Sequence, residues 1–210
     1  MPPLPVSEKE RDEAIFAHVV AHMSTQRLCS VHGAIFPAFK QLVSEHVITF
    51  QEMEALAAYS PFVPPGRERI FSQGLYAGFS QDFLTALHLL VPQIENSLRH
   101  LMQNRDIITT KLDNSGIQRQ IDLNELVVDP RLSAIVSGDI LFELRCLLTD
   151  NRGPNLRNQL AHGMLDDSEF SSVEAIYTWW LVLVLCIFSP VVKGPKPEPM
   201  PDSPNPNYSA

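Results

Sequence analysis

The sequence has 210 residues, of which 45% are hydrophobic and 19% charged, and its formal net charge at pH 7 is −8. This composition is typical of a globular chain that can bury a large core. The negative charge argues against a general binder of nucleic acids or anionic membranes, which needs a broad basic surface. A small local site that handles a phosphate remains compatible with it.

The N-terminal part of the chain is predicted to be helical. Ser7 and Glu10 form a capping box, and apolar residues follow it at helical spacing up to Met23. A second helix is expected over residues 26–46, kinked or broken near Pro37. A second capping box at residues 49–52 opens a third helix, which runs to about Tyr59. We therefore predict an N-terminal helical arm over residues 1–59.

A break follows at residues 60–69, where two adjacent prolines and a glycine prevent the helix from continuing. We interpret this segment as a linker to a main helical domain over residues 70–189. The last residues, 190–210, are rich in proline and are predicted to be an extended, disordered tail.

Within the main domain, apolar residues from Phe83 to Leu101 step by three or four along a long helix, which Pro92 is expected to bend. Residues 107–123 carry β-branched side chains on both sides of an Asp-Asn-Ser-Gly turn, which predicts a small β-hairpin. Asp139 is expected to cap a further helix. The capping box at residues 171–174 opens the last helix, which ends at Ser189. The predicted fold class is all-α, a helical bundle with a small β-hairpin insert.

Three features bear on the compartment. The cysteines Cys29, Cys146 and Cys186 are odd in number and mostly lie in apolar surroundings, which is typical of reduced core residues in the cytoplasm. The N-terminus shows no basic start followed by an apolar run, so we expect no signal peptide. The most apolar segment, residues 175–188, is shorter than the roughly 20 residues of a spanning helix. We therefore expect a cytoplasmic protein that makes no membrane contact.

The segment Asn155–Asp167, with the sequence NLRNQLAHGMLDD, combines polar groups that can act on a phosphate. At about 100° per residue, Leu156, Leu160 and Met164 fall on the buried side of a helix. Three polar residues, namely Arg157, Asn158 and His162, are expected to share the side that faces away from the core. Ala161 leaves a shallow space between the arginine and the histidine, and Gly163 can end the helix in a left-handed turn.

Arg157 offers a planar fork that suits phosphate oxygens. His162 lies at the negative end of the helix, where an imidazolium is favoured, so it is a candidate for proton transfer. Asn158 can orient His162 or bind the backbone. This group suits RNA cleavage by the substrate's own 2′-hydroxyl, which needs only proton transfer and charge stabilisation. The alternative is a surface cluster without chemistry.

The string RNQLAHG resembles the Arg-Asn-x-x-x-His-Gly signature of the domain of unknown function 4209 family. That family looks like a branch of the HEPN superfamily (higher eukaryotes and prokaryotes nucleotide-binding). The segment 78–102 is similar to the family's upstream helix, with its Pro-Gln-Ile-Glu-Asn-x-x-Arg string at Pro92–Arg99. The resemblance covers residues 70–189 and does not reach the arm.

The resemblance implies a bundle of four or five helices and a metal-independent endoribonuclease of a toxin–antitoxin, phage-defence or RNA-processing system. It implies Arg157 and His162 as catalytic residues with Asn158 in support, and Glu95 and Arg99 as candidate substrate-binding residues. It further implies RNA as the ligand, a homodimer with a composite cleft, and an antitoxin or other regulatory protein as a partner. Some toxin members carry a modifiable tyrosine two residues after the histidine, where this sequence has Met164.

Other residues have simpler interpretations. His18 and His22 have a metal-chelating spacing, but the second falls on an apolar helix face and no third ligand is evident, so packing is favoured. His88 has no neighbouring partner in the sequence and is interpreted as structural. At least one of Trp179 and Trp180 is expected in the core. Glu95 and Arg99 also make an ordinary helix-stabilising pair. We expect no metal and no cofactor. The alternative function is a non-catalytic RNA-binding or protein-interaction module.

Overall fold

The computed structural model describes residues 7–112 and 116–188. The predicted Pro-rich tail and most of the predicted Asp-Asn-Ser-Gly turn lie outside the described residues. The helices in chain order are α1 (Glu8–Ser30), the π-helical turn η1 (Val31–Ile35), α2 (Phe36–Glu45), α3 (Phe50–Tyr59), α4 (Glu68–Phe79), α5 (Phe83–Gln103), α6 (Leu123–Leu126), α7 (Pro130–Ser133), α8 (Gly138–Leu144), the π-helical turn η2 (Arg145–Thr149), α9 (Leu156–Ala161), the 3₁₀ turn η3 (Asp167–Ser171) and α10 (Val173–Ile187).

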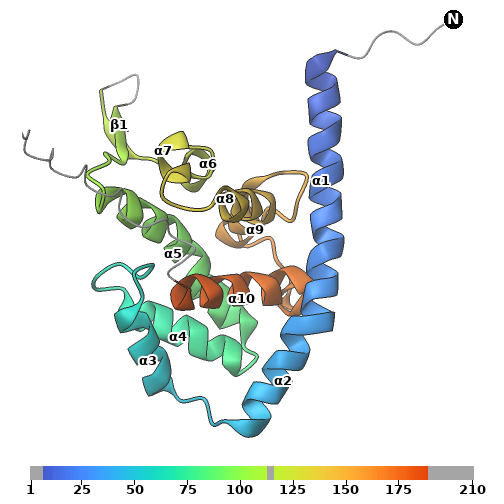
Figure 1. Ribbon diagram of the computed structural model, residues 1–210, viewed down its shortest axis with the longest axis vertical. Coiled ribbons are helices and arrows are strands. Elements are labelled where there is room, and N and C mark those ends of the chain that lie inside the picture. The colour runs from blue at the N-terminus through green and yellow to red at the C-terminus, as the bar shows by residue number, and fades with distance from the viewer. Residues whose placement is uncertain (1–6, 113–115, 189–210) are drawn as a thin grey trace, which may run out of the picture.

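Two short strands, β1 (Thr110–Leu112) and β2 (Gln118–Gln120), pair antiparallel with Lys111 opposite Arg119. The prediction of an all-α fold with a small hairpin is therefore confirmed. The hairpin extends from the end of α5, away from the helices (Figure 1).

The core lies where α4 and α5 pack together with α10 and α3 (Figure 1). Trp179 of α10 is the largest fully buried side chain, as expected for one of the two tryptophans. Its indole N–H donates to the backbone carbonyl of Leu75 on α4 at 3.1 Å, which satisfies the polar edge of the ring inside the core. Gly78 lies directly against this ring, and a Cβ atom there would overlap the indole. The close approach of α4 to α10 thus depends on glycine.

Residues from the predicted linker also enter the core. Phe62 and Val63 are buried between α3 and α4, and Phe62 packs edge-on against Phe71. The apolar side chains of this break therefore join the same cluster as α4 and α5.

The first two predicted helices differ from those observed. α1 continues to Ser30 without the expected interruption before Gln26. The irregularity is the π-helical turn η1, and Pro37 follows it at the start of α2. Proline has no N–H to donate to the carbonyl of Gly33, and the chain instead forms wider bonds, such as the one from the Phe36 amide to the carbonyl of Val31.

α1 and α2 form a long rod along one side of the bundle (Figure 1). A buried ion pair fixes the middle of this rod: Arg27 Nε donates to Glu143 Oε1 of α8 at 2.6 Å, and both side chains are at most 10% exposed. The two terminal nitrogens of Arg27 are buried and have no hydrogen-bond partner among the described residues. The guanidinium also faces the ring of Tyr177 at 5.9 Å.

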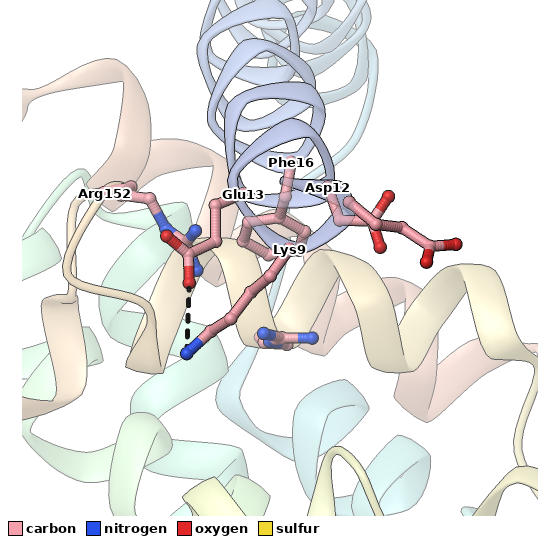
Figure 2. A pocket seen from close by; sticks show the side chains of 7 residues that line it. Lys9, Asp12, Glu13, Phe16 and Arg152 are labelled. Carbon is pink, nitrogen blue, oxygen red and sulfur yellow. Dashed lines mark ion pairs between the residues drawn. The ribbon is translucent and has the colours of Figure 1, made fainter. Parts of the chain in front are cut away.

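Nearer its N-terminus, α1 is fixed by an arginine–aromatic stack (Figure 2). The guanidinium carbons of Arg145 and Arg152 lie 4.4 and 4.2 Å from the ring centroid of Phe16. Asp150 pairs with both arginines, and its hydrogen bonds with Arg152 hold the pKa of its carboxyl below the usual value. An open hollow of about 530 Å³ lies here, lined by residues of both charge signs. Both arginines of this hollow are paired with Asp150 and pack against Phe16, so they connect α1 to the bundle.

The three cysteines are free thiols, of which Cys146 and Cys186 are buried and Cys29 is exposed on α1. The expectation of core cysteines is therefore confirmed for two of them and wrong for Cys29. Burial raises the pKa of the Cys186 thiol to about 12. No helix among the described residues has the length and apolar character needed to span a bilayer.

Candidate functional site

The motif segment forms α9, a helix of six residues that ends as the sequence predicts. His162 is its C-terminal cap, and Gly163 follows with φ of +62° in the left-handed region. Before the helix, Gly153 lies against the carbonyl of Cys146 so closely that a Cβ atom would overlap it. Asn155 then turns the chain with φ of +49°, a conformation that asparagine tolerates better than most residues. Two special backbone positions thus set the start of α9.

One expectation for this helix is wrong. Met164, placed on the buried side by the helical wheel, is 65% exposed. The helix has already ended at Gly163, so the periodicity that connects Leu156 and Leu160 does not extend to Met164. Leu156 is buried and Leu160 is partly buried against the core, as predicted.

α9 and α5 enclose a groove of about 490 Å³, within the size range of small-molecule sites. It is lined by His88, Val91, Pro92 and Glu95 from α5 and by Arg157, Leu160, Ala161 and His162 from α9. Arg157 and His162 of the predicted site therefore share one cavity. Glu95, a candidate drawn only from the resemblance, lies in the same wall.

Arg157 is held at the groove by two hydrogen bonds. Its Nη2 donates to Glu95 Oε2 at 3.2 Å, and its Nη1 donates to Asn158 Oδ1 at 2.9 Å. The arginine side chain keeps 31% of its surface exposed, and its Nε donates to no other described residue. The guanidinium is thus partly accessible from the groove, although one of its edges is occupied by a carboxylate.

Glu95 is the centre of this arrangement, because it accepts from three donors. Arg99 pairs with its Oε1, while Arg157 and the backbone N–H of Leu123 donate to its Oε2, the latter at 3.1 Å. Arg99 also donates through Nε to the carbonyl of Ile121. The segment that follows the hairpin is therefore tied to the same carboxylate as the motif arginine.

Two guanidinium groups and one carboxylate give this trio one net positive charge. Burial lowers the pKa of the Arg99 guanidinium, the nearby Asp122 carboxylate opposes that shift, and the charge of Arg157 adds to it. Arg99 does not line the groove, so the structure places it behind Glu95 as a support. With the nearby Asp122 carboxylate counted, the two acidic groups balance Arg99 and Arg157, so the wall beside the cavity carries both charge signs and no net charge.

Asn158 has neither of the two expected arrangements. Its side chain accepts from Arg157 and donates through Nδ2 to Asn155 Oδ1 at 2.8 Å, and it is not bonded to the His162 ring or to the backbone. The backbone carbonyl of Asn158 accepts the N–H of His162. Asn158 therefore positions Arg157 and the start of α9. The ring of His162 is exposed at the groove and makes no hydrogen bond within the described part of the chain.

His88 belongs to the groove, although its sequence context indicates a structural residue. Its Nδ1 lies 2.8 Å from the carbonyl oxygen of Leu84, and its ring packs against that of Phe170 at a centroid distance of 5.4 Å. The signal was present in the spacing, because residues 88 and 95 lie seven apart on one face of α5. Nothing in the sequence connects that face with α9.

His18 and His22 are exposed on α1. The described residues contain no group of three or more histidine, cysteine, aspartate or glutamate side chains arranged to hold a metal ion. Comparison of the chain with protein-family models, with curated proteins and with solved structures found no match.

Proposed function

We propose that the protein is a HEPN-like, metal-independent endoribonuclease whose active site is the groove between α5 and α9. The observation that carries this proposal is the position of Arg157 and His162 in the wall of one cavity, where the arginine is anchored and the imidazole has no hydrogen-bond partner among the described residues. A charged fork beside a free imidazole provides phosphate binding and proton transfer in one place.

The reaction in this proposal is an internal transesterification of RNA. The 2′-oxygen attacks the adjacent phosphorus, the bond from phosphorus to the 5′-oxygen breaks, and a 2′,3′-cyclic phosphate remains. One proton leaves the 2′-hydroxyl and one reaches the departing 5′-oxygen. His162 carries one of these protons. Arg157 binds the phosphate and stabilises the charge that develops on the phosphorane, and Asn158 and Glu95 hold its guanidinium in place.

Substrate, assembly and setting are proposed by extension from the resemblance. The substrate is RNA, because the reaction requires a 2′-hydroxyl. A homodimer would bring two motifs to a composite cleft, and an antitoxin or another regulatory protein would control a toxin or phage-defence role in the cytoplasm. With a net charge of −8, non-specific RNA affinity should be low. The enzyme should therefore be selective for RNA structure or depend on a partner.

The test is cleavage of labelled RNA by the purified protein in excess EDTA, comparing the wild type with His162→Ala. We expect EDTA-resistant cleavage, products that end in a cyclic phosphate, and a loss of about 10²–10⁴-fold in the variant. Arg157→Lys keeps the charge but loses the bidentate fork, so its rate should fall as well. His22→Ala, on the exposed surface of α1, is the matched control and should cleave like the wild type.

The rival function, a non-catalytic RNA-binding or protein-interaction module, has one observation in its favour. Glu95 already occupies an edge of the Arg157 guanidinium, so the arginine is partly engaged before any ligand arrives. Equal background cleavage in wild type and His162→Ala would favour this rival. If RNA binding then weakens in Arg157→Ala, the groove is an RNA-binding site. If binding is unchanged, the groove is excluded as the RNA-binding site.

A further inference from the structure

His88 is a residue of the groove that has no assigned role and whose imidazole can transfer protons. It lies on α5, in the wall that also contains Glu95, and its cavity is the one that His162 lines from α9. The proposed transesterification moves two protons, whereas the motif supplies one imidazole per chain. A second imidazole in the same cavity can therefore carry the second proton.

The hydrogen bond of His88 fixes its tautomer. A backbone carbonyl can only accept, so the contact of 2.8 Å with the oxygen of Leu84 requires the proton on Nδ1. In the neutral ring, the lone pair is then on Nε2. Because Nδ1 is turned back toward its own helix, Nε2 lies on the opposite side of the ring. Nε2 is thus an acceptor in an exposed ring at the groove wall.

The ring is also held in orientation. It packs against Phe170 of η3 with an interplanar angle of 30°, and the bond to Leu84 restricts its rotation. A proton acceptor with fixed tautomer and fixed plane is what general-base catalysis requires. His162, by contrast, has an exposed ring that makes no hydrogen bond within the described part of the chain, so it is available for the second proton transfer.

We propose that His88 is the second catalytic residue of this groove and acts as the general base, with His162 as the general acid. This inference rests on the proposed endoribonuclease function. Nε2 of His88 accepts the proton of the 2′-hydroxyl as the bond between the 2′-oxygen and phosphorus forms. His162 donates a proton to the 5′-oxygen as its bond to phosphorus breaks. Exchange with solvent then restores both rings, so a single chain contains both proton-transfer groups.

The charged groups around the two rings are few. Glu95 and Arg157 line the groove from α5 and α9, and Glu95 is bonded to Arg99 and Arg157. The turn that supplies Phe170 also carries Asp167 and Glu169, and Glu169 caps the backbone at Asp166. An acid and a base acting together give a rate that rises and then falls with pH.

The experiment compares pH–rate profiles of RNA cleavage in EDTA for the wild type, His88→Phe and His162→Ala. Phenylalanine keeps a ring against Phe170 but has no nitrogen, so the fold should be retained, as thermal unfolding will check. We expect His88→Phe to cleave about 10²–10⁴-fold more slowly and to lose one limb of the profile, with partial rescue by added imidazole. His100→Phe, farther along α5 and outside the groove, is the matched control.

The outcomes distinguish the two proposals. In one outcome the wild type cleaves RNA, His162→Ala is inactive, and His88→Phe keeps the full rate and both limbs of the pH–rate profile. That outcome refutes the role of His88 and leaves the endoribonuclease proposal intact. Slower cleavage with both limbs unchanged would reduce His88 to a packing residue and also refute it. If His88→Phe unfolds, His88→Gln replaces it and the same criteria apply. A wild type without EDTA-resistant cleavage would overturn both proposals.

Discussion

Glu95 and Arg157 lie 62 positions apart in the sequence and meet at 3.2 Å between Oε2 and Nη2. This ion pair is the direct link between the long helix α5 and the motif helix α9, and the carboxylate in it is only 18% exposed. The same carboxylate holds Arg99 and the N–H of Leu123. One side chain therefore sets the relation among three separate segments.

Replacement of Glu95 by glutamine should disturb both the fold and the groove. The amide keeps the size but removes the charge shared by two arginines, and the loss of a charge-assisted hydrogen bond costs about 1–3 kcal/mol. We expect a lower midpoint of thermal unfolding and a lower kcat/KM for RNA, because Arg157 loses its anchor. Circular dichroism and the cleavage assay measure the two effects. Glu54→Gln, on the exposed surface of α3, should change neither, and an unaltered Glu95→Gln protein would contradict the role of the ion pair.

The buried pair of Arg27 and Glu143 predicts a strongly asymmetric response to mutation. Glu143→Leu leaves a buried guanidinium without its carboxylate, which typically costs about 3–5 kcal/mol of the free energy of unfolding. The double variant Arg27→Met, Glu143→Leu removes both charges and should recover most of that loss. Urea unfolding provides the measurement.

The control for this pair is Lys9→Ala, which breaks an exposed ion pair with Glu13 on α1. Its effect should stay below about 1 kcal/mol. A double variant that is no more stable than Glu143→Leu would show that the charges matter less than the packing of the Arg27 side chain.

Gly78 and Gly33 differ in the space that is available for a side chain. A Cβ atom at position 78 would overlap the ring of Trp179, whereas at position 33 it meets nothing within 4 Å. We expect Gly78→Ala to destabilise the protein by about 1–3 kcal/mol through overpacking and to shift the emission of Trp179. Gly33→Ala should be neutral or stabilising by up to about 1 kcal/mol, since alanine favours helix. If Gly33→Ala destabilised the protein more than Gly78→Ala, the close packing of α4 against α10 would be contradicted.

Asp150 predicts a dependence of stability on pH. Hydrogen bonding to Arg152 lowers the pKa of the Asp150 carboxyl in the folded protein. The ionised carboxylate is therefore favoured by folding, and its contribution is present above the unfolded pKa of about 3.9. It is lost as the pH falls through the folded value. The gap in unfolding free energy between wild type and Asp150→Asn should be largest near pH 7 and close progressively below about pH 4. A difference in unfolding free energy that does not change with pH would refute the role of the ionised Asp150 carboxylate.

The sequence predicts the fold class well because the signals of helix termini are local. The capping boxes at Ser7 and Thr49 form as expected. Farther along, Ser172 rather than Ser171 caps α10, and α8 begins at Gly138, just before the expected cap at Asp139. Neighbouring residues compete for the cap position within a single turn, and tertiary packing decides between them. Shifts of one residue at a helix end are finer than local sequence patterns can resolve.

The candidate site could be predicted only in part. Arg157, Asn158 and His162 are neighbours in sequence, so a single helical segment brings them together. The exposed position of Met164 depends on where Gly163 ends that segment. His88 reaches the groove only because α5 packs beside α9, which is a long-range relation that no local pattern encodes. Asn158 accepts from Arg157 and is not bonded to the His162 ring, a choice of partner that the helical spacing alone does not specify.

The unequal burial of the three thiols has a practical consequence. The thiolate is the nucleophile in alkylation, and burial holds Cys146 and Cys186 in the protonated form. Cys29 alone of the three lies at the surface. A maleimide dye should therefore attach to the native protein at one defined position on α1, and labelling at the other two would report the loss of native structure without any engineered substitution.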